Sequence, residues 1–295
     1  MRFDKYAGKA DLVYGGPPCQ PFSTGGLRRA QDDKRNMIPS FLETLRTVRP
    51  DAFVMENVPG LTIESRISYL RGVLRELRLL GYVVTWDVLN AADYGVPQKR
   101  RRLFIVGLPD RPFRFPRPTH GLQNGLPYVR AGSVISREQP RGTPPDCPVR
   151  YAKYPDLRRS PYAGHLYNGG GRPVNLAEPS HTVLASSGGY KTHWVDVLDI
   201  APAYHQHLMD GGAPREGDVP GARRLTVEES ALLQTFPQDM VFCGSRSAQY
   251  TQIGDAVPPR LAEVIGKALI DQLGAQSVDE AIYWPVGHVQ MELVL

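Results

Sequence analysis

Apolar residues in the first third of the chain follow two spacings, which together predict alternating strands and helices. Residues 41–48 have helical spacing and stop before Pro50. Four short apolar runs have the length of buried strands: residues 11–14, 53–55, 82–89 and 102–106. Strands that alternate with helices predict an α/β fold with a doubly wound sheet.

A longer amphipathic pattern lies between the second and third strand runs. Leucine or isoleucine recurs at helical spacing, and arginine stands at positions between them, which predicts a helix with one buried face. Gly81 stands where the cap at the end of this helix belongs. The apolar positions are Ile67, Leu70, Leu74, Leu77 and Leu80, and the interleaved arginines are Arg66, Arg71, Arg75 and Arg78.

The pattern changes near Pro109. Residues 109–222 are rich in proline, glycine and arginine and show little helical periodicity, which predicts an irregular, β-containing module. Regular patterning returns at Thr226, where Glu229 completes the signature of a capping box. A last helix is expected at residues 259–273, and residues 275–295 receive no assignment. The changes predict four segments: a first part of the main domain at 1–108, the module at 109–222, a returning part at 223–270 and a tail at 271–295.

The composition indicates a folded protein. Hydrophobic residues make up 41% of the chain and charged residues 22%, which is enough apolar material for a core. The longest apolar run, residues 103–108, is much too short to cross a bilayer, so no membrane association is expected. Residues 1–10 are polar and mixed in charge, which argues against secretion. The cysteines Cys19, Cys147 and Cys243 are widely separated, so neither a disulfide framework nor a metal cluster is expected, and a reducing cytoplasm fits.

The charge balance favours a nucleic acid as partner. The chain has 35 basic and 30 acidic residues, and only seven of the basic residues are lysine. Arginine suits phosphates and guanine edges because its planar guanidinium donates hydrogen bonds in pairs. Between positions 111 and 172, eleven basic residues stand against three acidic ones. A basic balance alone also fits an ordinary solvated surface.

Candidate chemical groups follow the first two predicted strands. Cys19 lies in the sequence Gly-Gly-Pro-Pro-Cys-Gln-Pro-Phe-Ser, where the prolines stiffen the approach to the sulfur. Glu56 and Asn57 follow the second strand, so both segments are expected at one edge of the sheet. Taken singly, Cys19 is more often a buried structural cysteine and Glu56 a loop carboxylate that caps a turn.

A basic run precedes the fourth predicted strand, with the sequence Gln98-Lys-Arg-Arg-Arg102. In an extended chain, Arg100 and Arg102 share one face while Arg101 points the other way. The alternative is a solvated basic patch beside a strand. Four histidines lack metal-ligand spacing and are expected on the surface or in the core: His120, His165, His181 and His193.

Together these segments resemble the DNA cytosine-5 methyltransferase family. The segment around Cys19 is similar to its nucleophile motif, residues 56–58 to its glutamate motif and residues 98–102 to its arginine motif. Residues 224–237 resemble the motif that supports the recognition domain, and residues 252–258 resemble the last motif, which returns to the donor site. The resemblance covers about residues 11–108 and 223–270. It implies a Rossmann-like methyltransferase sheet with a target recognition domain inserted at 109–222.

The resemblance also implies a reaction, the transfer of a methyl group from S-adenosylmethionine to carbon 5 of a cytosine flipped out of the duplex. Cys19 would attack carbon 6 and make carbon 5 enamine-like, and Glu56 would give or share a proton at nitrogen 3. Arg102 would hold the base oxygen, and Arg100 would support the Cys and phosphate side. No metal is implied. Further implied contacts are Ser23, Asn57 and Gln98 with the substrate, and Pro18, Ile38, Asp255 and Ala256 with the donor.

The implied partner is double-stranded DNA, in a restriction–modification or orphan methylation system. A cognate restriction endonuclease is a candidate second partner, and the expected place is the cytoplasm, at the nucleoid, in a prokaryotic or phage setting. Thymidylate synthase also attacks carbon 6 of a pyrimidine, but there a histidine normally follows the cysteine, where this chain has Gln20. The tRNA-methylating branch of the family has a Cys-Phe-Thr tripeptide that is absent here, so DNA is preferred.

The chain departs from the family pattern in two places. The glycine-rich loop and the acidic residues that hold the donor in the family do not precede residue 11, so an N-terminally incomplete sheet is expected. Asp255 stands where the family usually has asparagine, and its carboxylate would repel that of the donor. Two hypotheses follow: an enzyme completed by a separate N-terminal portion or subunit, or a non-catalytic DNA-binding fragment. Intact Cys19, Glu56, Arg100 and Arg102 favour the enzyme.

Overall fold

The chain folds into two compact units, each with its own hydrophobic core. The structure is a computed structural model that describes residues 3–19, 35–138, 140, 147–274, 279 and 282–284. The first unit contains Met1–Asn90, Arg101–Pro118 and Glu263–Leu295, and the second contains Ala91–Arg100 and Thr119–Ala262.

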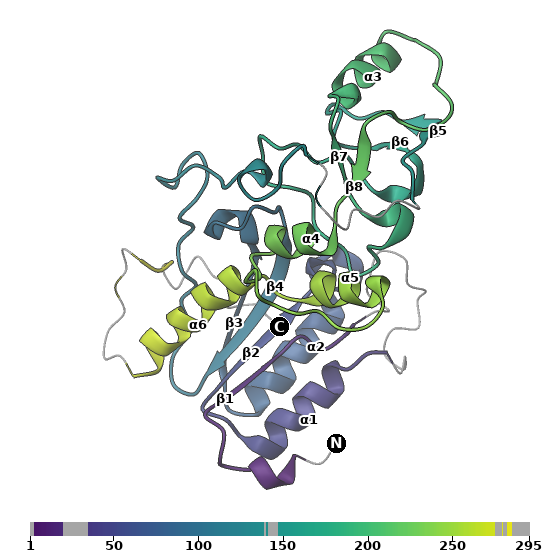
Figure 1. The fold of residues 1–295 in the computed structure, drawn as a ribbon. Coiled ribbons are helices and arrows are strands. Elements are labelled where there is room, and N and C mark those ends of the chain that lie inside the picture. The colour runs from purple at the N-terminus through teal and green to yellow at the C-terminus, as the bar shows by residue number, and fades with distance from the viewer. Residues whose placement is uncertain are drawn as a thin grey trace. The chain divides into compact units, whose positions relative to one another are not determined.

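A four-stranded sheet forms the centre of the first unit, in the order β1-β2-β4-β3 (Figure 1). Strand β1 runs parallel to β2, whereas β4 runs antiparallel to both of its neighbours. The four predicted strands are confirmed, and the sheet is mixed because of the direction of β4. The bounds are Leu12–Gly15 (β1), Ala52–Asn57 (β2), Val83–Asn90 (β3) and Arg101–Leu108 (β4).

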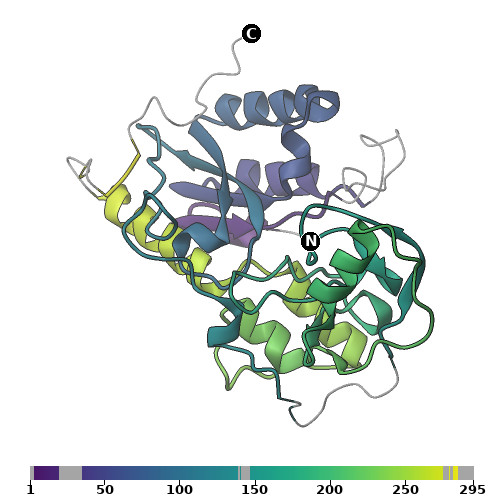
Figure 2. The same cartoon turned by 90° about the horizontal axis from the view of Figure 1, so that it is seen from above.

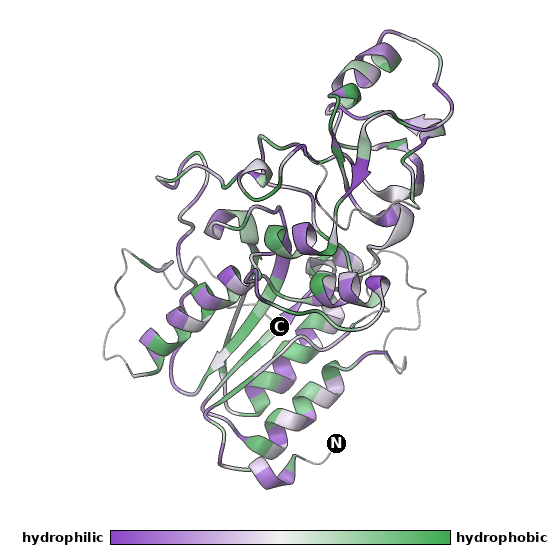
Figure 3. Ribbon diagram, viewed as in Figure 1, coloured by the Kyte–Doolittle hydropathy of each residue, from purple (hydrophilic) through white to green (hydrophobic). Residues whose placement is uncertain are grey.

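Helices cover both faces of this sheet, as the view in Figure 2 shows. Helices α1 (Ile38–Val48) and α2 (Glu64–Leu79) lie on one face, and α6 (Pro259–Leu273) lies on the other. The strands are largely hydrophobic and the helices two-sided (Figure 3), so the core forms between the layers. Gly81 follows α2 with a φ of +98°, a conformation that favours glycine at a helix end. None of the described helices has the length and apolarity needed to cross a membrane.

The described part of the second unit consists of short elements joined by irregular chain. The strands confirm the prediction of β-structure at 109–222, but α3 was not predicted there. Its buried face is Ala201, Tyr204, His205 and Leu208, which is too polar to stand out as an apolar stripe. The bounds are Tyr151–Asp156 (β5), His165–Tyr167 (β6), Trp194–Asp196 (β7), Ile200–Met209 (α3), Ala222–Arg224 (β8), Val227–Leu233 (α4) and Arg246–Asp255 (α5).

The predicted capping box begins α4. The backbone N–H of Glu229 donates to Thr226 Oγ1, and the backbone N–H of Thr226 donates to the Glu229 carboxylate at 2.9 Å. The same carboxylate accepts two hydrogen bonds of 2.8 Å from the Arg223 guanidinium of β8. Both ionic side chains are more than nine-tenths buried, so this pair ties the start of α4 to the neighbouring strand.

Candidate active site

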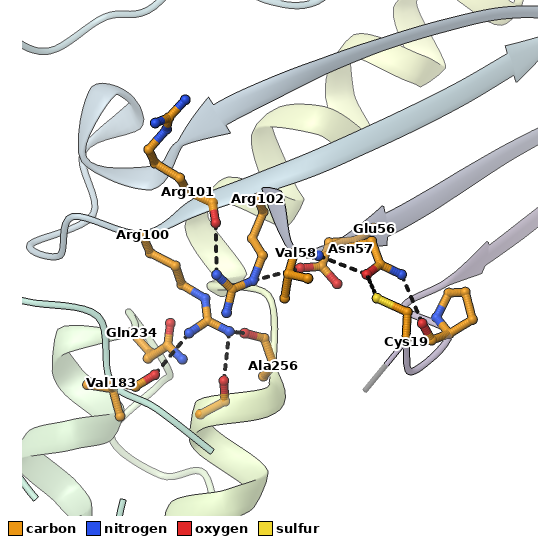
Figure 4. A network of polar contacts seen from close by, with 12 residues as sticks. Cys19, Glu56, Asn57, Val58, Arg100, Arg101, Arg102, Val183, Gln234 and Ala256 are labelled. Carbon is orange, nitrogen blue, oxygen red and sulfur yellow. Dashed lines mark hydrogen bonds and ion pairs between the residues drawn. The ribbon is translucent and has the colours of Figure 1, made fainter. Parts of the chain in front are cut away.

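The chain segments that follow β1 and β2 meet at one edge of the first unit's sheet, because the two strands are parallel. Gly15 pairs with Met55 at the end of the ladder. The Cys19 thiol donates a hydrogen bond to Asn57 Oδ1, and Asn57 Nδ2 donates to the Pro17 carbonyl at 2.9 Å (Figure 4). The predicted meeting of these two segments is therefore confirmed.

Strand register brings Glu56 and Arg102 together. Glu56 lies opposite Phe104 of β4, and Arg102 lies two residues before Phe104, on the same face of the sheet. Such diagonal neighbours are within reach of long side chains. Arg102 Nε lies 2.9 Å from Glu56 Oε1, and the side chains are 15% and 10% exposed (Figure 4). The carboxylate is thus held by an arginine largely out of water.

Gly16 gives the Glu56 carboxylate its space. A Cβ atom at position 16 would lie only 2.9 Å from Glu56 Oε2, inside normal van der Waals contact. Any larger residue would therefore push the carboxylate away from its present place. The glycine of the Cys19 motif thus contributes to the site by leaving room for a neighbouring strand's side chain.

The Cys19 thiol is held in its neutral form. Burial makes the largest contribution and, together with the charge of Glu56, raises the pKa of Cys19 from 9.0 to about 11. The positive charge of Arg66 opposes this rise, as do hydrogen bonds with Asn57 and with the Val58 backbone. The thiolate is the nucleophilic form, so the thiol has to lose its proton before it can react.

The chain returns to Cys19 at residues 36–38. Cys19 pairs with Asn36 in an isolated β-bridge, and the Met37 backbone N–H donates to the Pro18 carbonyl at 2.8 Å. Asn36 Nδ2 donates to the Tyr69 hydroxyl of α2 at 2.7 Å. Ile38, the first residue of α1, is fully buried in the same core as Cys19, whereas Pro18 is exposed. Both predicted donor residues of this unit, Pro18 and Ile38, therefore belong to the segments around Cys19, and their contact with a donor stays a prediction.

Arg100 belongs to the second unit, where it is fully buried. Its Nη1 donates to the Val183 carbonyl at 3.0 Å, and its Nη2 donates to the Gly254 and Ala256 carbonyls at 2.7 and 2.8 Å (Figure 4). The guanidinium thus joins the segment around Val183 to the end of α5. The predicted role of Arg100 beside the cysteine and a phosphate stays a prediction.

Gln98 is also fully buried in the second unit. Its Oε1 accepts a hydrogen bond from the Val183 backbone N–H at 3.0 Å, and its Nε2 donates to the Leu233 carbonyl at 3.2 Å. Gln98 and Arg100 therefore hold Val183 by its two backbone groups. Because both ends of the Gln98 amide bind protein, its predicted substrate contact stays a prediction.

The remaining predicted residues are spread over the chain. Asp255 is the exposed last residue of α5, and the half-buried Ala256 follows it. Ser23 lies outside the described residues. In the described part of the chain, no three side chains of the His, Cys, Asp and Glu type group in a way that could hold a metal ion.

Several residues near Cys19 lie outside the sequence motifs and were not identified from the sequence. Arg66 appears in the sequence only as one of four arginines on a helix, and Asn36 and Tyr69 stand in no recognisable pattern. The fold alone brings these three toward Cys19. Gln234 donates to the Ile253 carbonyl, next to the Gly254 carbonyl that Arg100 binds. The sequence could have indicated Gln234, because it lies within the motif at residues 224–237.

The chain is similar in sequence to known DNA methyltransferases. The family described as C-5 cytosine-specific DNA methylase matches residues 2–125 and 166–271. The Type II methyltransferase M.SacI of Streptomyces achromogenes is 31% identical, over 97% of this chain and 78% of its own length. The Type II methyltransferase M.AplI of Arthrospira platensis is 33% identical, over 88% of this chain and 68% of its own.

Solved structures share the fold at lower identity. The S. pombe Dnmt2 methyltransferase aligns with a TM-score of 0.58 at 16% identity, covering 93% of this chain and 84% of its own. A DNA modification methyltransferase encoded within an E. coli prophage aligns with a TM-score of 0.54 at 18% identity, covering 90% and 80%. These likenesses concern the fold, and the predicted α/β methyltransferase class is confirmed by them.

Proposed function

The chain belongs to the family of C-5 cytosine-specific DNA methylases and is a DNA cytosine-5 methyltransferase, and we propose that Cys19 is the nucleophile of its reaction. The observation that carries the proposal is the cluster at the edge of the first unit's sheet. There Cys19 contacts Asn57, and Glu56 is paired with Arg102. A thiol, a carboxylate and a guanidinium are the three kinds of group that this chemistry needs.

The chemical problem is that carbon 5 of cytosine is a weak nucleophile inside an aromatic ring. The deprotonated Cys19 sulfur forms a bond to carbon 6, and the electron pair of the 5,6 double bond becomes available at carbon 5. Glu56 shares a proton at nitrogen 3 as negative charge moves onto the ring. Once carbon 5 carries the methyl group, a base removes its proton. The electrons of that C–H bond re-form the double bond as the sulfur leaves.

Arg102 is assigned to the oxygen of the base. Its Nε is paired with Glu56, and its Nη1 donates to the Arg101 carbonyl at 2.8 Å, so the guanidinium has a fixed orientation. A charge-assisted hydrogen bond to the base oxygen stabilises the negative charge that develops on the ring. Glu56 and Arg102 then act on neighbouring atoms of the same base edge.

Gln98 and Arg100 are assigned to positioning. Their side chains hold the Val183 backbone, and Arg100 also holds the carbonyls of Gly254 and Ala256. Gln98 and Arg100 would therefore affect the reaction indirectly, by fixing the position of these segments of the second unit. Asn57 and Ser23 remain assigned to the substrate side, Asn57 through its contact with the nucleophile.

S-adenosylmethionine, the donor that the family implies, supplies an electrophilic methyl group. The described residues fit it in part. Pro18 is exposed next to Cys19, and the exposed Asp255 carboxylate can accept a hydrogen bond from the donor's ammonium group while it repels the donor's carboxylate. Ile38 is fully buried, so it can support the donor site only from the core. Ala256 contributes by packing, because its carbonyl already accepts from Arg100.

The substrate is double-stranded DNA, with the target cytosine turned out of the stack so that the sulfur can reach carbon 6. Residues 109–222 are assigned to target recognition because of their position between the matched motifs and their arginine content. The Type II names of the relatives support a place in a restriction–modification system. A cognate endonuclease in the same prokaryotic cytoplasm belongs to this proposal.

A covalent trap tests the assignment of Cys19. Bisulfite sequencing of DNA from cells that express the protein identifies the methylated site. With S-adenosylmethionine present, a duplex with 5-fluorocytosine at that site should form an adduct that survives a denaturing gel. After methyl transfer fluorine cannot leave carbon 5 as a cation, so the sulfur is not released.

The matched variants decide the outcome of this trap. Cys19→Ser should abolish the adduct and methylation, since a hydroxyl ionises far less than a thiol. Cys147→Ser and Cys243→Ser should leave both intact. A shifted band that persists in Cys19→Ser would place the nucleophile elsewhere.

A further inference from the structure

The second unit contains a cavity of about 480 Å³ lined mainly by cationic, imidazole and glycine residues. Its side chains include Lys99, Arg172, Lys191 and the imidazole of His181, and we call it the basic cavity. No aspartate or glutamate is among the described residues that line it. A cavity with this lining attracts an anion.

The cations of the basic cavity differ in how far they are already neutralised. Lys99 lies 2.6 Å from Glu178, but both side chains are about half exposed, so water screens this pair. In the part of the chain that the structure describes, the side chains of Arg172 and Lys191 make no ion pair. The cavity therefore keeps at least two positive charges for a ligand.

Two histidines at the cavity have defined roles. His193 accepts a hydrogen bond from the Arg172 backbone N–H on Nδ1 and donates from Nε2 to the Thr182 carbonyl, so both ring nitrogens are used. Burial lowers the pKa of His193 to about 4, which keeps this ring neutral and makes it a brace for the wall. His181 donates from Nε2 to the Tyr162 carbonyl at 2.6 Å.

His181 is the partly buried imidazole of the cavity that can respond to an anion, and the exposed His165 also lines the cavity. Burial lowers its pKa most, and Arg172 and Lys99 lower it further, whereas the Tyr162 hydrogen bond and Glu178 raise it. The neutral ring of His193 lies 5.7 Å away, centroid to centroid. A negative ligand would offset the two cations, so His181 would take up a proton on binding.

One wall of the cavity is bare backbone. Gly169 and Gly170 both have positive φ, +80° and +81°, which side chains rarely adopt. A Cβ atom at Gly169 would lie 2.3 Å from the Tyr190 Cβ, so this glycine is required by packing as well. The absence of side chains here lets a ligand approach the chain closely.

We propose that the basic cavity receives one phosphodiester of the DNA backbone. The inference rests on the proposed function, since it takes DNA as the substrate. The alternative DNA group with several acceptors is the edge of guanine. A neutral base would leave the charges of Arg172 and Lys191 uncompensated, whereas a phosphate neutralises one of them and carries no sequence information.

Salt dependence of DNA binding distinguishes the two groups. Affinity of the purified full chain is measured against salt on two duplexes, one of mixed sequence and one carrying the methylated site. Lys191→Ala and Arg172→Ala should each weaken binding to both duplexes by the same factor. Each should also lower the slope of log affinity against log salt, by at most roughly one because a single phosphate is involved. Lys267→Ala, an exposed lysine on α6, is the matched control and should change neither quantity.

Three results of these binding measurements would contradict the proposal, and they can be told apart. A loss confined to the duplex with the methylated site, at unchanged salt slope, would mean that the cavity reads a base and would overturn the proposal. Normal binding and slope in both variants would overturn it too, while leaving the methyltransferase assignment intact. A wild-type chain that binds neither duplex would remove the proposed function and this inference with it. Melting temperatures of the variants check that the fold is retained.

A second measurement uses the protonation of His181. Because the bound phosphate favours the protonated ring, wild-type affinity should increase as the pH falls from about 8 to about 5.5. His181→Gln should remove more of this dependence than His165→Gln, whose imidazole lies at the exposed side of the cavity, and His207→Gln, on α3 and outside the cavity, should retain it. A pH dependence that is the same in His181→Gln and wild type would contradict the presence of an anion beside His181.

Discussion

Cys19 stands between a carboxylate that opposes its ionisation and an arginine that favours it. Burial contributes most to a pKa of about 11, Glu56 adds to the rise and Arg66 opposes it. A rise of two units from 9.0 leaves about a hundredfold less thiolate at neutral pH, and only the thiolate reacts. The carboxylate that we propose to act on the base therefore also keeps the Cys19 thiol in its unreactive form.

Alkylation tests this balance, because burial and a raised pKa both slow the reaction of Cys19 while the charge variants change only the pKa. In a Cys147→Ser, Cys243→Ser protein, iodoacetamide should modify folded Cys19 about a hundredfold more slowly at pH 8 than the urea-unfolded chain. Glu56→Gln removes a charge that raises the pKa and should speed the reaction, whereas Arg66→Ala should slow it. The rates follow from mass spectrometry of quenched samples. Equal rates in the folded and unfolded chains, or shifts of the same sign in the two variants, would contradict this account.

At the scale of elements, sequence patterns predicted those with a strong local signal. The helix at Pro259–Leu273 and the capping box of Thr226 and Glu229 are found as predicted, because an apolar stripe and a cap are local properties. Helix α5 was not predicted, because only Tyr250, Ile253 and Gly254 of its ten residues are buried. The direction of β4 was not predicted either, because strand direction depends on pairing across the sheet.

The same division holds for the candidate site. The edge that joins Cys19 to Asn57 could be predicted, because parallel strands place their carboxyl ends together. The pairing of Glu56 with Arg102 needed the antiparallel register of β2 and β4, which no local pattern encodes. The burial of Arg100 could not be predicted from the sequence either, because its hydrogen-bond acceptors are backbone carbonyls, which any residue supplies.

The ion pair between Arg223 and Glu229 should be the strongest polar contribution to the stability of the second unit's α4. Glu229→Ala leaves the buried Arg223 guanidinium without its carboxylate and also removes half of the capping box, so we expect a loss of about 3–5 kcal/mol. Thr226→Ala removes only the side-chain cap and should cost about 1 kcal/mol. Urea unfolding measures both. Similar losses of unfolding free energy in Glu229→Ala and Thr226→Ala would contradict a large contribution from the buried Arg223–Glu229 pair.

At the scale of the whole molecule, folding brings residues that are far apart in sequence into contact. Arg100 binds carbonyls 83, 154 and 156 residues further along the chain, all within the second unit. Gly254 makes this possible, because a Cβ there would lie 2.3 Å from the backbone between Leu184 and Ala185. The motif around Arg100 and the last motif are therefore linked by one buried guanidinium.

Arg100→Lys separates a positioning role from a contact with DNA. Lysine cannot span three carbonyls with a planar fork, so buried acceptors lose partners that are each worth about 1–3 kcal/mol. The melting temperature should therefore fall, and methylation should fall with it at unchanged salt dependence of DNA binding. An unchanged melting temperature with a reduced salt slope would instead show that Arg100 contacts a phosphate.

Exchange of residues 109–222 tests the proposal that this segment recognises the target sequence while the rest of the chain catalyses the reaction. The proposed catalytic residues Cys19, Glu56 and Arg102 belong to the first unit, and residues 109–222 lie outside that unit apart from their first ten positions. The strand β8 ends at Arg224, whose guanidinium donates to the Thr192 carbonyl at 2.7 Å, and β8 pairs with β7. The second junction should therefore follow Arg224, so that this pairing stays within one parent. A chimera that carries the corresponding segment of a Type II relative should methylate carbon 5 of cytosine at the relative's site, as bisulfite sequencing would show. An active chimera that keeps the original site would mean that sequence is read outside this module.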